Sequence, residues 1–275
     1  MIDILLATYN GEQFLREQLD SILAQTYQSW QLFVRDDSST DNTREIIKHY
    51  TQSYPEKFIV YTDKLGNIGP KRSFEELLTH CAKNEYIMFC DQDDVWLPEK
   101  IARTLAAIKT IEQKRPQKPA LAYTDMLLVD ENTQSLNITF WKFNRLKMPK
   151  ANQWPWLCVA NPMAGCTCMI NSAARDAVLP FPKDIPMHDW WILAQTTRLG
   201  ITTYIDAPTS LYRQHQANYC GVRHPGWRYY IHIIGSPIQK WNEFAKLRPF
   251  LNAIGFGSVA KFTWYKVIYA VLRRL

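Results

Sequence analysis

Three aspartates follow directly on a short apolar run in this chain of 275 residues. The run covers residues 86–90, and Asp91, Asp93 and Asp94 come next. Such a run is typical of a buried strand, so we expect a strand that ends in closely spaced negative charges. A hard divalent cation with oxygen ligands, usually shared with a phosphate, would relieve their repulsion. The pattern indicates a metal and diphosphate site; the alternative is a solvated acidic turn that caps the helix opened by Pro98.

Apolar runs alternate with helical patterns along the first third of the chain. Strands are predicted at 2–7, 30–35, 58–62 and 86–90, with amphipathic helices between them. This alternation predicts an α/β fold with a mostly parallel, twisted sheet flanked by helices, in which ligands bind beyond the carboxyl ends of the strands. Polar clusters stand at those ends, at residues 8–11, 36–41, 67–69 and 91–94. We expect these clusters to converge on one crevice. Polar loops that merely face solvent would not need to lie together.

The middle of the chain continues this pattern with more irregular segments. Strands are predicted at 120–129, 166–171 and 202–206, and helices from Pro98 to about residue 113 and at 190–198. Asp125, within the first of these strands, either contacts a ligand or has a structural role. Between residues 141 and 156 aromatic side chains, including Trp141, interleave with basic ones. This pattern suits stacking on sugar rings or a lipid-facing lid, and buried core aromatics are the alternative.

Length and composition limit the classes of protein that fit this chain. With 47% hydrophobic and 21% charged residues, it is expected to form one large globular domain or a domain with an appendage. No stretch has the roughly 18 uninterrupted apolar residues of a membrane span, and no basic region precedes an apolar run at the N-terminus. We therefore expect neither a transmembrane helix nor a signal peptide, and a cytoplasmic location. The six cysteines are expected to be reduced core residues.

Basic residues concentrate toward the C-terminus. From Ala207 onward there are ten lysines and arginines but a single acid, Glu243, whereas the preceding part of the chain is net negative. Aromatic residues mix with these basic ones from Pro225 onward, as in amphipathic helices at an anionic membrane surface. A homo-oligomer contact is the alternative. No nucleic-acid partner is expected, because no binding motif accompanies this segment and the rest of the chain is acidic.

Four motifs together resemble one enzyme family. They are Thr-Tyr-Asn at 8–10, Asp-Asp-Ser-Ser-Thr-Asp at 36–41, Asn-Ile-Gly at 67–69 and Asp-Gln-Asp-Asp-Val-Trp at 91–96. In this order they are similar to the motifs of family 2 glycosyltransferases with the GT-A fold, over about residues 1–221. The resemblance implies a metal-dependent, inverting hexosyltransferase that uses a nucleoside diphosphate sugar. It further implies a donor-binding half at about 1–98, an acceptor-binding half at about 99–221 and a basic, aromatic helical extension at 222–275.

The resemblance also assigns roles around the donor. The backbone near Thr8 and the side chain of Asp36 would hold the pyrimidine and ribose, since a carboxylate can accept the imide N–H of uracil or thymine, which cytosine lacks. Asp93, Asp91 and His215 would hold Mn²⁺ or Mg²⁺. For His215 a structural role is the alternative. The residues expected to bind the donor are Thr8, Tyr9, Asn10, Asp36, Asp37, Asn67, Arg72, Asp91, Gln92, Trp190 and Arg213.

A late aspartate is implied as the general base. Asp189 lies in the segment His-Asp-Trp-Trp at 188–191. In the family an Asp at the start of this helix takes the proton of the acceptor hydroxyl as that hydroxyl attacks the anomeric carbon. The alternative is that Asp189 only caps the helix, for which Asp is a preferred residue. Asp125, Trp141 and Trp191 are the residues expected at the acceptor.

The motifs are most similar to the rhamnosyltransferase-like branch of the family. This similarity implies dTDP-rhamnose as donor and a lipid-linked or growing cell-surface polysaccharide as acceptor, at the inner face of the cell membrane. UDP-hexoses and UDP-N-acetylhexosamines stay open, because pocket shape selects the sugar. A sugar nucleotidyltransferase should carry a glycine-rich, basic loop after the first strand, but residues 8–11 contain one glycine and no basic residue precedes Arg16. A catalytically silent nucleotide-binding scaffold would not need Asp189.

Overall fold

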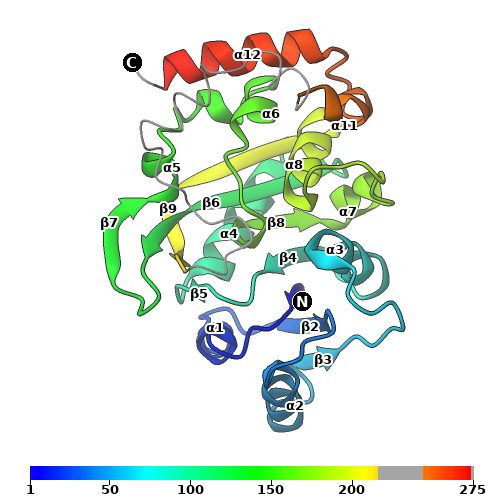
Figure 1. Cartoon of the computed structure of the whole chain (residues 1–275), viewed down its shortest axis with the longest axis vertical. Coiled ribbons are helices and arrows are strands. Elements are labelled where there is room, and N and C mark those ends of the chain that lie inside the picture. Colours follow the sequence, from blue (N-terminus) through cyan, green and yellow to red (C-terminus); the bar gives the residue numbers. More distant parts are fainter. Residues whose placement is uncertain (216–243, 274–275) are drawn as a thin grey trace.

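The computed structural model describes residues 1–215 and 244–273, and one mixed sheet runs through this part of the chain. The strands are β1 (Ile2–Thr8), β2 (Trp30–Asp36), β3 (Phe58–Val60), β4 (Tyr86–Cys90), β5 (Val95–Trp96), β6 (Ala120–Val129), β7 (Ser135–Thr139), β8 (Cys168–Asn171) and β9 (Ile201–Arg213). Their order in the sheet is β3-β2-β1-β4-β8-β6-β9-β5, and β7 pairs with β6 beside this path. In Figure 1 the strands β1 to β3 lie in the lower half.

The first four strands pair in parallel, as the alternating pattern predicts. Helices α1 (Leu15–Leu23), α2 (Thr43–Ser53) and α3 (Gly69–His80) connect them. Thr8 of β1 stands opposite Asp36 of β2, and Leu6 of β1 stands opposite Cys90 of β4. The polar segments that follow these strands therefore begin at the same edge of the sheet, which is what the predicted crevice requires.

Antiparallel strands complete the sheet in the second half of the chain. β8 lies between β4 and β6 and runs antiparallel to both. β9 is longer than the predicted strand at 202–206, because its last three residues also pair with residues 127–129 of β6. The helices here are α4 (Lys100–Glu112), α5 (Phe140–Phe143), α6 (Trp156–Ala160), α7 (Ser172–Val178) and α8 (His188–Leu199).

The C-terminal helices α11 (Arg248–Ala253) and α12 (Val259–Leu272) pack against α6 and α8. The rings of Phe250 and Phe262 lie with centroids 5.0 and 6.3 Å from the ring of Trp190 on α8. Trp156 of α6 meets Tyr265 of α12 edge-on at 4.9 Å. Figure 1 shows α12 at one end of the molecule, beside α6 and α11. The expected helical extension is confirmed for residues 248–272, and it shares its hydrophobic core with α8.

Several expectations from the sequence concern the interior and the membrane. The five cysteines in the described part of the chain are free and buried, as predicted. Cys220, like the aromatic and basic residues between 222 and 243, lies outside the described residues. Among the helices that the structure describes, none combines the length and the apolar character needed to cross a bilayer.

Candidate active site

The acid turn, residues 91–94 between β4 and β5, contains the candidate metal ligands. One ligand atom each of Asp91, Asp94 and Cys166 lies within 4.8 Å of the other two. Asp94 is fully buried, and its Oδ2 atom has no hydrogen-bond partner in the described part of the chain. Burial raises the pKa of the Asp94 carboxyl well above its ordinary value, and the charges of Asp93 and Asp91 raise it further. The carboxylates of the acid turn therefore repel one another, and the nearby Lys100 offsets this only in part, since the pKa of Asp91 stays raised.

Asp93 pairs with His215, which follows β9. The Nε2 atom of His215 lies 2.9 Å from Oδ2 of Asp93. The imidazole also packs against Phe14, with ring centroids 4.7 Å apart. The structure thus brings Asp91, Asp93 and His215, the three expected metal ligands, to one place; their binding of a cation stays a prediction.

Arg213 is buried beside this pair, and protein groups hold its guanidinium. Nε donates to the carbonyl of Asp93 at 2.9 Å, and Nη1 donates to the carbonyl of Glu131 at 2.6 Å. Nη2 forms an ion pair with Glu17 of α1, and Cζ lies 4.6 Å from the centre of the Phe14 ring. These contacts tie α1, the acid turn and the loop after β6 together. Arg213 positions the acid turn, and its expected contact with the donor stays a prediction.

The residues of the acid turn fit a hard divalent cation. Carboxylate oxygens are the ligands that Mg²⁺ and Mn²⁺ prefer. A buried polar atom such as Oδ2 of Asp94 carries a desolvation cost unless a hydrogen bond or a cation meets it. Burial and the charge of Asp93 also raise the pKa of Asp91. A cation at this position would remove the repulsion that raises both pKa values.

Asp189 lies close to the acid turn. Asp189 lies next to Gly165, because a Cβ atom added to Gly165 would lie 3.6 Å from Cβ of Asp189. Gly165 directly precedes Cys166, a residue of the candidate metal-binding group. The charge of Asp189 contributes to the raised pKa of Asp91. Burial raises the pKa of Asp189 to about 6, although hydrogen bonds from the backbone of Trp190 and Gly165 lower it. The sequence prediction that Asp189 and the acid turn share one site requires this proximity.

The capping role, the alternative reading of Asp189, does not match the start of α8. The N-cap residue is Met187, which makes no side-chain capping bond, and Asp189 is already the second residue of the helix. Its carboxylate accepts the N–H of the adjacent Trp190 at 2.6 Å and a backbone hydrogen bond from Gly165, which lies outside the helix. A carboxylate in the first turn still interacts favourably with the helix dipole. Capping alone therefore does not account for Asp189.

Gln92 connects the acid turn to the end of β1. Its Oε1 atom accepts the N–H of Tyr9 at 2.8 Å, and its Nε2 atom donates to the carbonyl of Tyr9 at 2.9 Å. Gly11 makes room for this clamp, because a Cβ atom added there would lie 2.3 Å from Oε1 of Gln92. The side chain of Tyr9 stays 48% exposed. Gln92 therefore joins the polar cluster that follows β4 to the polar cluster that follows β1.

Replacing Gly11 with alanine should break this clamp. The new Cβ collides with the end of the Gln92 side chain, which must then leave the backbone of Tyr9. We expect the free energy of unfolding, measured by chemical denaturation, to fall by about 1–3 kcal/mol, as for other overpacked sites. In the double variant Gly11→Ala, Gln92→Ala the collision is absent, so its loss should be smaller than the sum of the two single losses. Additive losses would contradict the clamp.

Asp36, at the end of β2, is surrounded by hydrogen-bond donors. Oδ1 accepts the hydroxyls of Thr8, at 3.1 Å, and of Ser39. Oδ2 accepts the N–H of Ser39 at 3.0 Å and Nε of Arg44 at 2.7 Å. The N–H of Asn10 donates to the Ser39 hydroxyl at 2.9 Å, so the expected donor residues near β1 and β2 form one network. The Arg44 side chain is 60% exposed, and exposed ion pairs of this kind are weak and readily exchanged.

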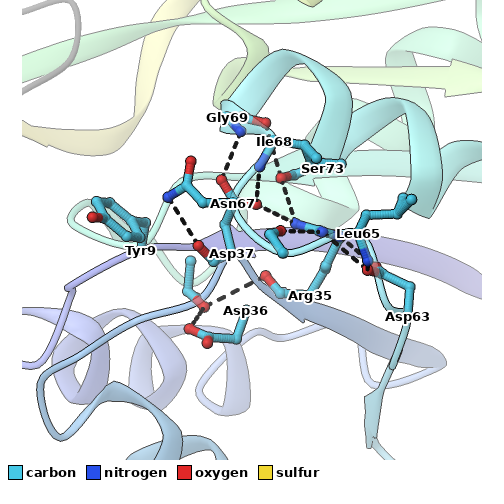
Figure 2. A network of polar contacts seen from close by, with 12 residues as sticks. Tyr9, Arg35, Asp36, Asp37, Asp63, Leu65, Asn67, Ile68, Gly69 and Ser73 are labelled. Carbon is cyan, nitrogen blue, oxygen red and sulfur yellow. Dashed lines mark hydrogen bonds and ion pairs between the residues drawn. The ribbon is translucent and has the colours of Figure 1, made fainter.

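Asp37 and Asn67 organise the loop that leads into α3, as Figure 2 shows. The carboxylate of Asp37 accepts the N–H groups of Ile68 and Gly69 at 2.8 and 2.7 Å and pairs with the buried Arg35. Nδ2 of Asn67 donates to the carbonyl of Asp37 at 3.0 Å. These bonds satisfy backbone groups at the start of the helix. The observed contacts of both residues are structural, and their contact with a donor stays a prediction.

Three further predicted residues are also held by protein groups. Arg72 forms an ion pair with a glutamate one turn further along α3. Nε1 of Trp190 donates to the carbonyl of Cys158 at 3.0 Å, and Nε1 of Trp191 donates to the carbonyl of Val178 at 2.8 Å. Trp191 is buried in the core. The roles assigned to Arg72, Trp190 and Trp191 stay predictions.

Two of the three residues whose ligand atoms lie within 4.8 Å of one another, Asp94 and Cys166, were not predicted as metal ligands from the sequence. Asp94 belongs to the predicted run, but the motif favours Asp91 and Asp93, and only burial shows that Asp94 points inward. Cys166 lies in a 3₁₀ turn (Gly165–Thr167) that contacts the acid turn through the fold. No local pattern around Cys166 indicates that contact.

Comparison with known proteins decides the family. The model described as "Glycosyl transferase family 2" matches residues 3–163. The chain belongs to glycosyl transferase family 2. This family 2 enzyme is 30% identical over 234 residues to the dTDP-rhamnosyl transferase RfbG of Shigella flexneri, covering 78% of this chain and 73% of that protein. It spans between 33% and 61% of the length of three further curated relatives.

Solved structures confirm the GT-A fold of the family 2 enzyme. TarS of S. aureus in complex with UDP superposes with a TM-score of 0.62 at 15% identity, over 98% of this chain and 91% of that one. The mannosyltransferase PcManGT from Pyrobaculum calidifontis, in complex with GDP-Man and Mn²⁺, gives a TM-score of 0.57 at 16% identity, over 98% and 73%. At these identities the likeness concerns the fold alone.

Proposed function

We propose that this enzyme transfers L-rhamnose from dTDP-rhamnose to a saccharide hydroxyl, with inversion at the anomeric carbon. The observation that carries the proposal is the proximity of Asp189 to the acid turn, because an inverting transfer needs a base beside the site of the leaving diphosphate. The similarity to a dTDP-rhamnosyl transferase supports the donor sugar. A UDP-hexose or UDP-N-acetylhexosamine is the second candidate, because a TarS structure of the same fold contains UDP-GlcNAc.

In this proposal the nucleotide lies at the carboxyl ends of β1 and β2. Asp36 exchanges the exposed Arg44 for the imide N–H of thymine or uracil. Tyr9, with its exposed ring, and Asn10 flank the nucleotide. Asp37 and Asn67 keep the loop before α3 in place.

The acid turn would hold the diphosphate and a divalent cation. Asp93, Asp91 and His215 would hold Mn²⁺ or Mg²⁺, and the cation would supply charge neutralisation at the departing diphosphate. The Mn²⁺ in the mannosyltransferase of the same fold supports this choice. Arg213 and Phe14 keep Asp93 and His215 in place.

Asp189 acts on the acceptor side. Its carboxylate takes the proton of the attacking hydroxyl while the new glycosidic bond forms and the bond to the diphosphate breaks. Burial raises the pKa of Asp189 to about 6, so the carboxylate is ionised at pH 7 yet more basic than an exposed aspartate. A catalytically silent scaffold would have no use for this arrangement.

The outer face of α12 suits a membrane that carries the acceptor. Trp264, Val267 and Val271 are 64%, 56% and 54% exposed, and Lys261 is exposed on the same helix. Exposed apolar residues with basic neighbours are typical of helices at anionic membrane interfaces. We propose that the enzyme works at the inner face of the cell membrane on a lipid-linked or growing cell-surface polysaccharide. A contact between copies of the chain is the alternative use of this face.

A thermal-shift panel tests the donor proposal. The panel contains dTDP-rhamnose, UDP-glucose, UDP-N-acetylglucosamine and CDP, each with Mn²⁺ or with a chelator. A ligand at 100 times its Kd stabilises the folded state by about 2.7 kcal/mol. We expect the largest rise in Tm for dTDP-rhamnose with Mn²⁺ and little for CDP, which lacks the imide N–H. Equal shifts for all nucleotides, independent of the metal, would contradict the proposal, and a larger shift for a UDP-sugar would favour the second candidate.

A further inference from the structure

A cavity of about 280 Å³ opens beside β6, β9 and α5, elements that lie together in Figure 1. Its walls combine charged and apolar side chains. The main charged residues are Asp125, Asp206 and Lys142, and the main apolar ones are Trp141, Met148 and Pro208. Two carboxylates, an ammonium group and apolar side chains in one cavity are suited to a ligand that carries hydroxyl groups and also has an apolar C–H face.

An irregular stretch of strand pairing forms this cavity. Residue 124 of β6 pairs with residue 205 of β9, but the next residue, Asp125, pairs with Pro208. The two intervening residues of β9, Asp206 and Ala207, therefore bulge out of the ladder, and the side chain of Asp206 is exposed at the cavity. Bulges re-aim side chains and occur preferentially next to active sites.

Asp125 is fixed in the wall of the cavity although it is only 4% exposed. Its Oδ1 atom accepts the N–H groups of Met126 at 2.8 Å and of Trp141 at 3.0 Å. Burial raises the pKa of the Asp125 carboxyl, against hydrogen bonds from Thr139 and the two amides that lower it. The nearby charge of Asp206 raises the pKa further. Two carboxylates are thus held near each other, one buried and oriented, one at the rim.

Tyr212 lies between the acid turn and α5, the helix that contributes Trp141 and Lys142 to the cavity. The ring of Tyr212 meets the ring of Phe140, on α5, edge-on at 6.2 Å. Burial raises the pKa of Tyr212, and the charges of Asp94 and Asp91 raise it further, so Tyr212 lies near the acid turn. One side chain therefore separates the acid turn from the helix that lines the cavity.

We propose that this cavity binds one sugar ring of the acceptor saccharide, next to the ring that receives the transferred sugar. The inference rests on the proposed glycosyl transfer and specifies where its acceptor lies. Hydroxyls of the sugar ring donate to Asp125 and Asp206, and Lys142 donates to a ring or hydroxyl oxygen. The apolar side chains of the cavity cover the face of the ring that carries C–H groups. Drug-sized ligands occupy pockets of about 300–1,000 Å³, so the volume here suits a single ring.

Saturation-transfer NMR on the full chain tests this inference, without any need for turnover. The probes are methyl glycosides of rhamnose, galactose and N-acetylglucosamine, at millimolar concentration. We expect at least one probe to bind, and Asp206→Asn and Asp125→Asn each to weaken its binding by about tenfold, the loss typical of a hydrogen bond to a charged group. Asp125→Asn keeps an oxygen for both amides, so folding should be preserved. The control is Asp176→Asn, an exposed aspartate on α7 outside the cavity, which should bind normally.

Binding of dTDP, measured on the same samples, separates this inference from the proposed function. If the glycoside binds equally to all variants, or if no glycoside binds, the cavity is not an acceptor subsite, whatever dTDP does. If dTDP fails to bind the wild-type chain while the aspartate variants lose the glycoside, the donor proposal fails and the saccharide site stands. Normal dTDP binding in Asp206→Asn and Asp125→Asn would show that the variants are folded.

Discussion

Asp189→Asn should lower the rate of sugar transfer by about 10²- to 10⁴-fold, the usual contribution of a general base. The asparagine keeps an oxygen that can accept the N–H of Trp190, so the start of α8 is preserved. It cannot take a proton from the acceptor hydroxyl. The measurement is the single-turnover rate of transfer from the donor identified in the thermal-shift panel to a saccharide acceptor.

Two controls give this result its meaning. Asp184→Asn removes an exposed carboxylate from the loop before α8 and should transfer at the wild-type rate. Binding of dTDP to Asp189→Asn should be unchanged, because Asp189 acts on the acceptor side. A variant that lost nucleotide binding together with transfer would place Asp189 at the donor instead, and an active Asp189→Asn would remove it from the chemistry.

Asp93→Ala should abolish the metal-dependent part of nucleotide binding. Asp93 contributes a carboxylate next to His215, and its removal leaves the imidazole without this partner. Even residues outside the first coordination sphere typically change metal affinity by about 10–100-fold, so a loss at least this large is expected. Calorimetric titration with Mn²⁺ in the presence of dTDP measures it.

The matched variant is Glu99→Ala, which removes an exposed acid near the start of α4, a few residues beyond the acid turn. It should bind Mn²⁺ like the wild type, because it changes the net charge equally without touching the site. Equal losses in Asp93→Ala and Glu99→Ala would mean that the cation responds to overall charge alone. The cation would then have no specific site at Asp93.

The sequence was most informative where apolar runs make buried strands. Residues 86–90 are predicted as a strand and form β4, and residues 120–129 form β6, because each run is long enough to be buried on both faces. β5 and the last part of β9 were not predicted. Both pair with distant residues, such as Trp96 with Ser210, and no local periodicity indicates such contacts.

The same distinction between local patterns and long-range contacts applies to the residues of the candidate site. The family motifs implied Asp91, Asp93, Asp189 and His215 as site residues. In the structure His215 pairs with Asp93, and Asp189 lies near enough to Asp91 to raise its pKa. The clamp of Gln92 on Tyr9 and the inward position of Cys166 depend on long-range packing. For Arg213, the family resemblance implied a contact with the donor, whereas the contacts observed for its guanidinium are with protein acceptors.

The pH dependence of transfer tests the central role of Asp189 most directly. The base acts only when ionised, and burial raises its pKa to about 6, above the usual range for aspartate. With donor and acceptor saturating, the single-turnover rate of the wild-type enzyme should be constant above about pH 7 and fall about tenfold for each pH unit well below 6. A rate that stays constant down to about pH 4.5 in a folded enzyme would contradict the assignment of the base.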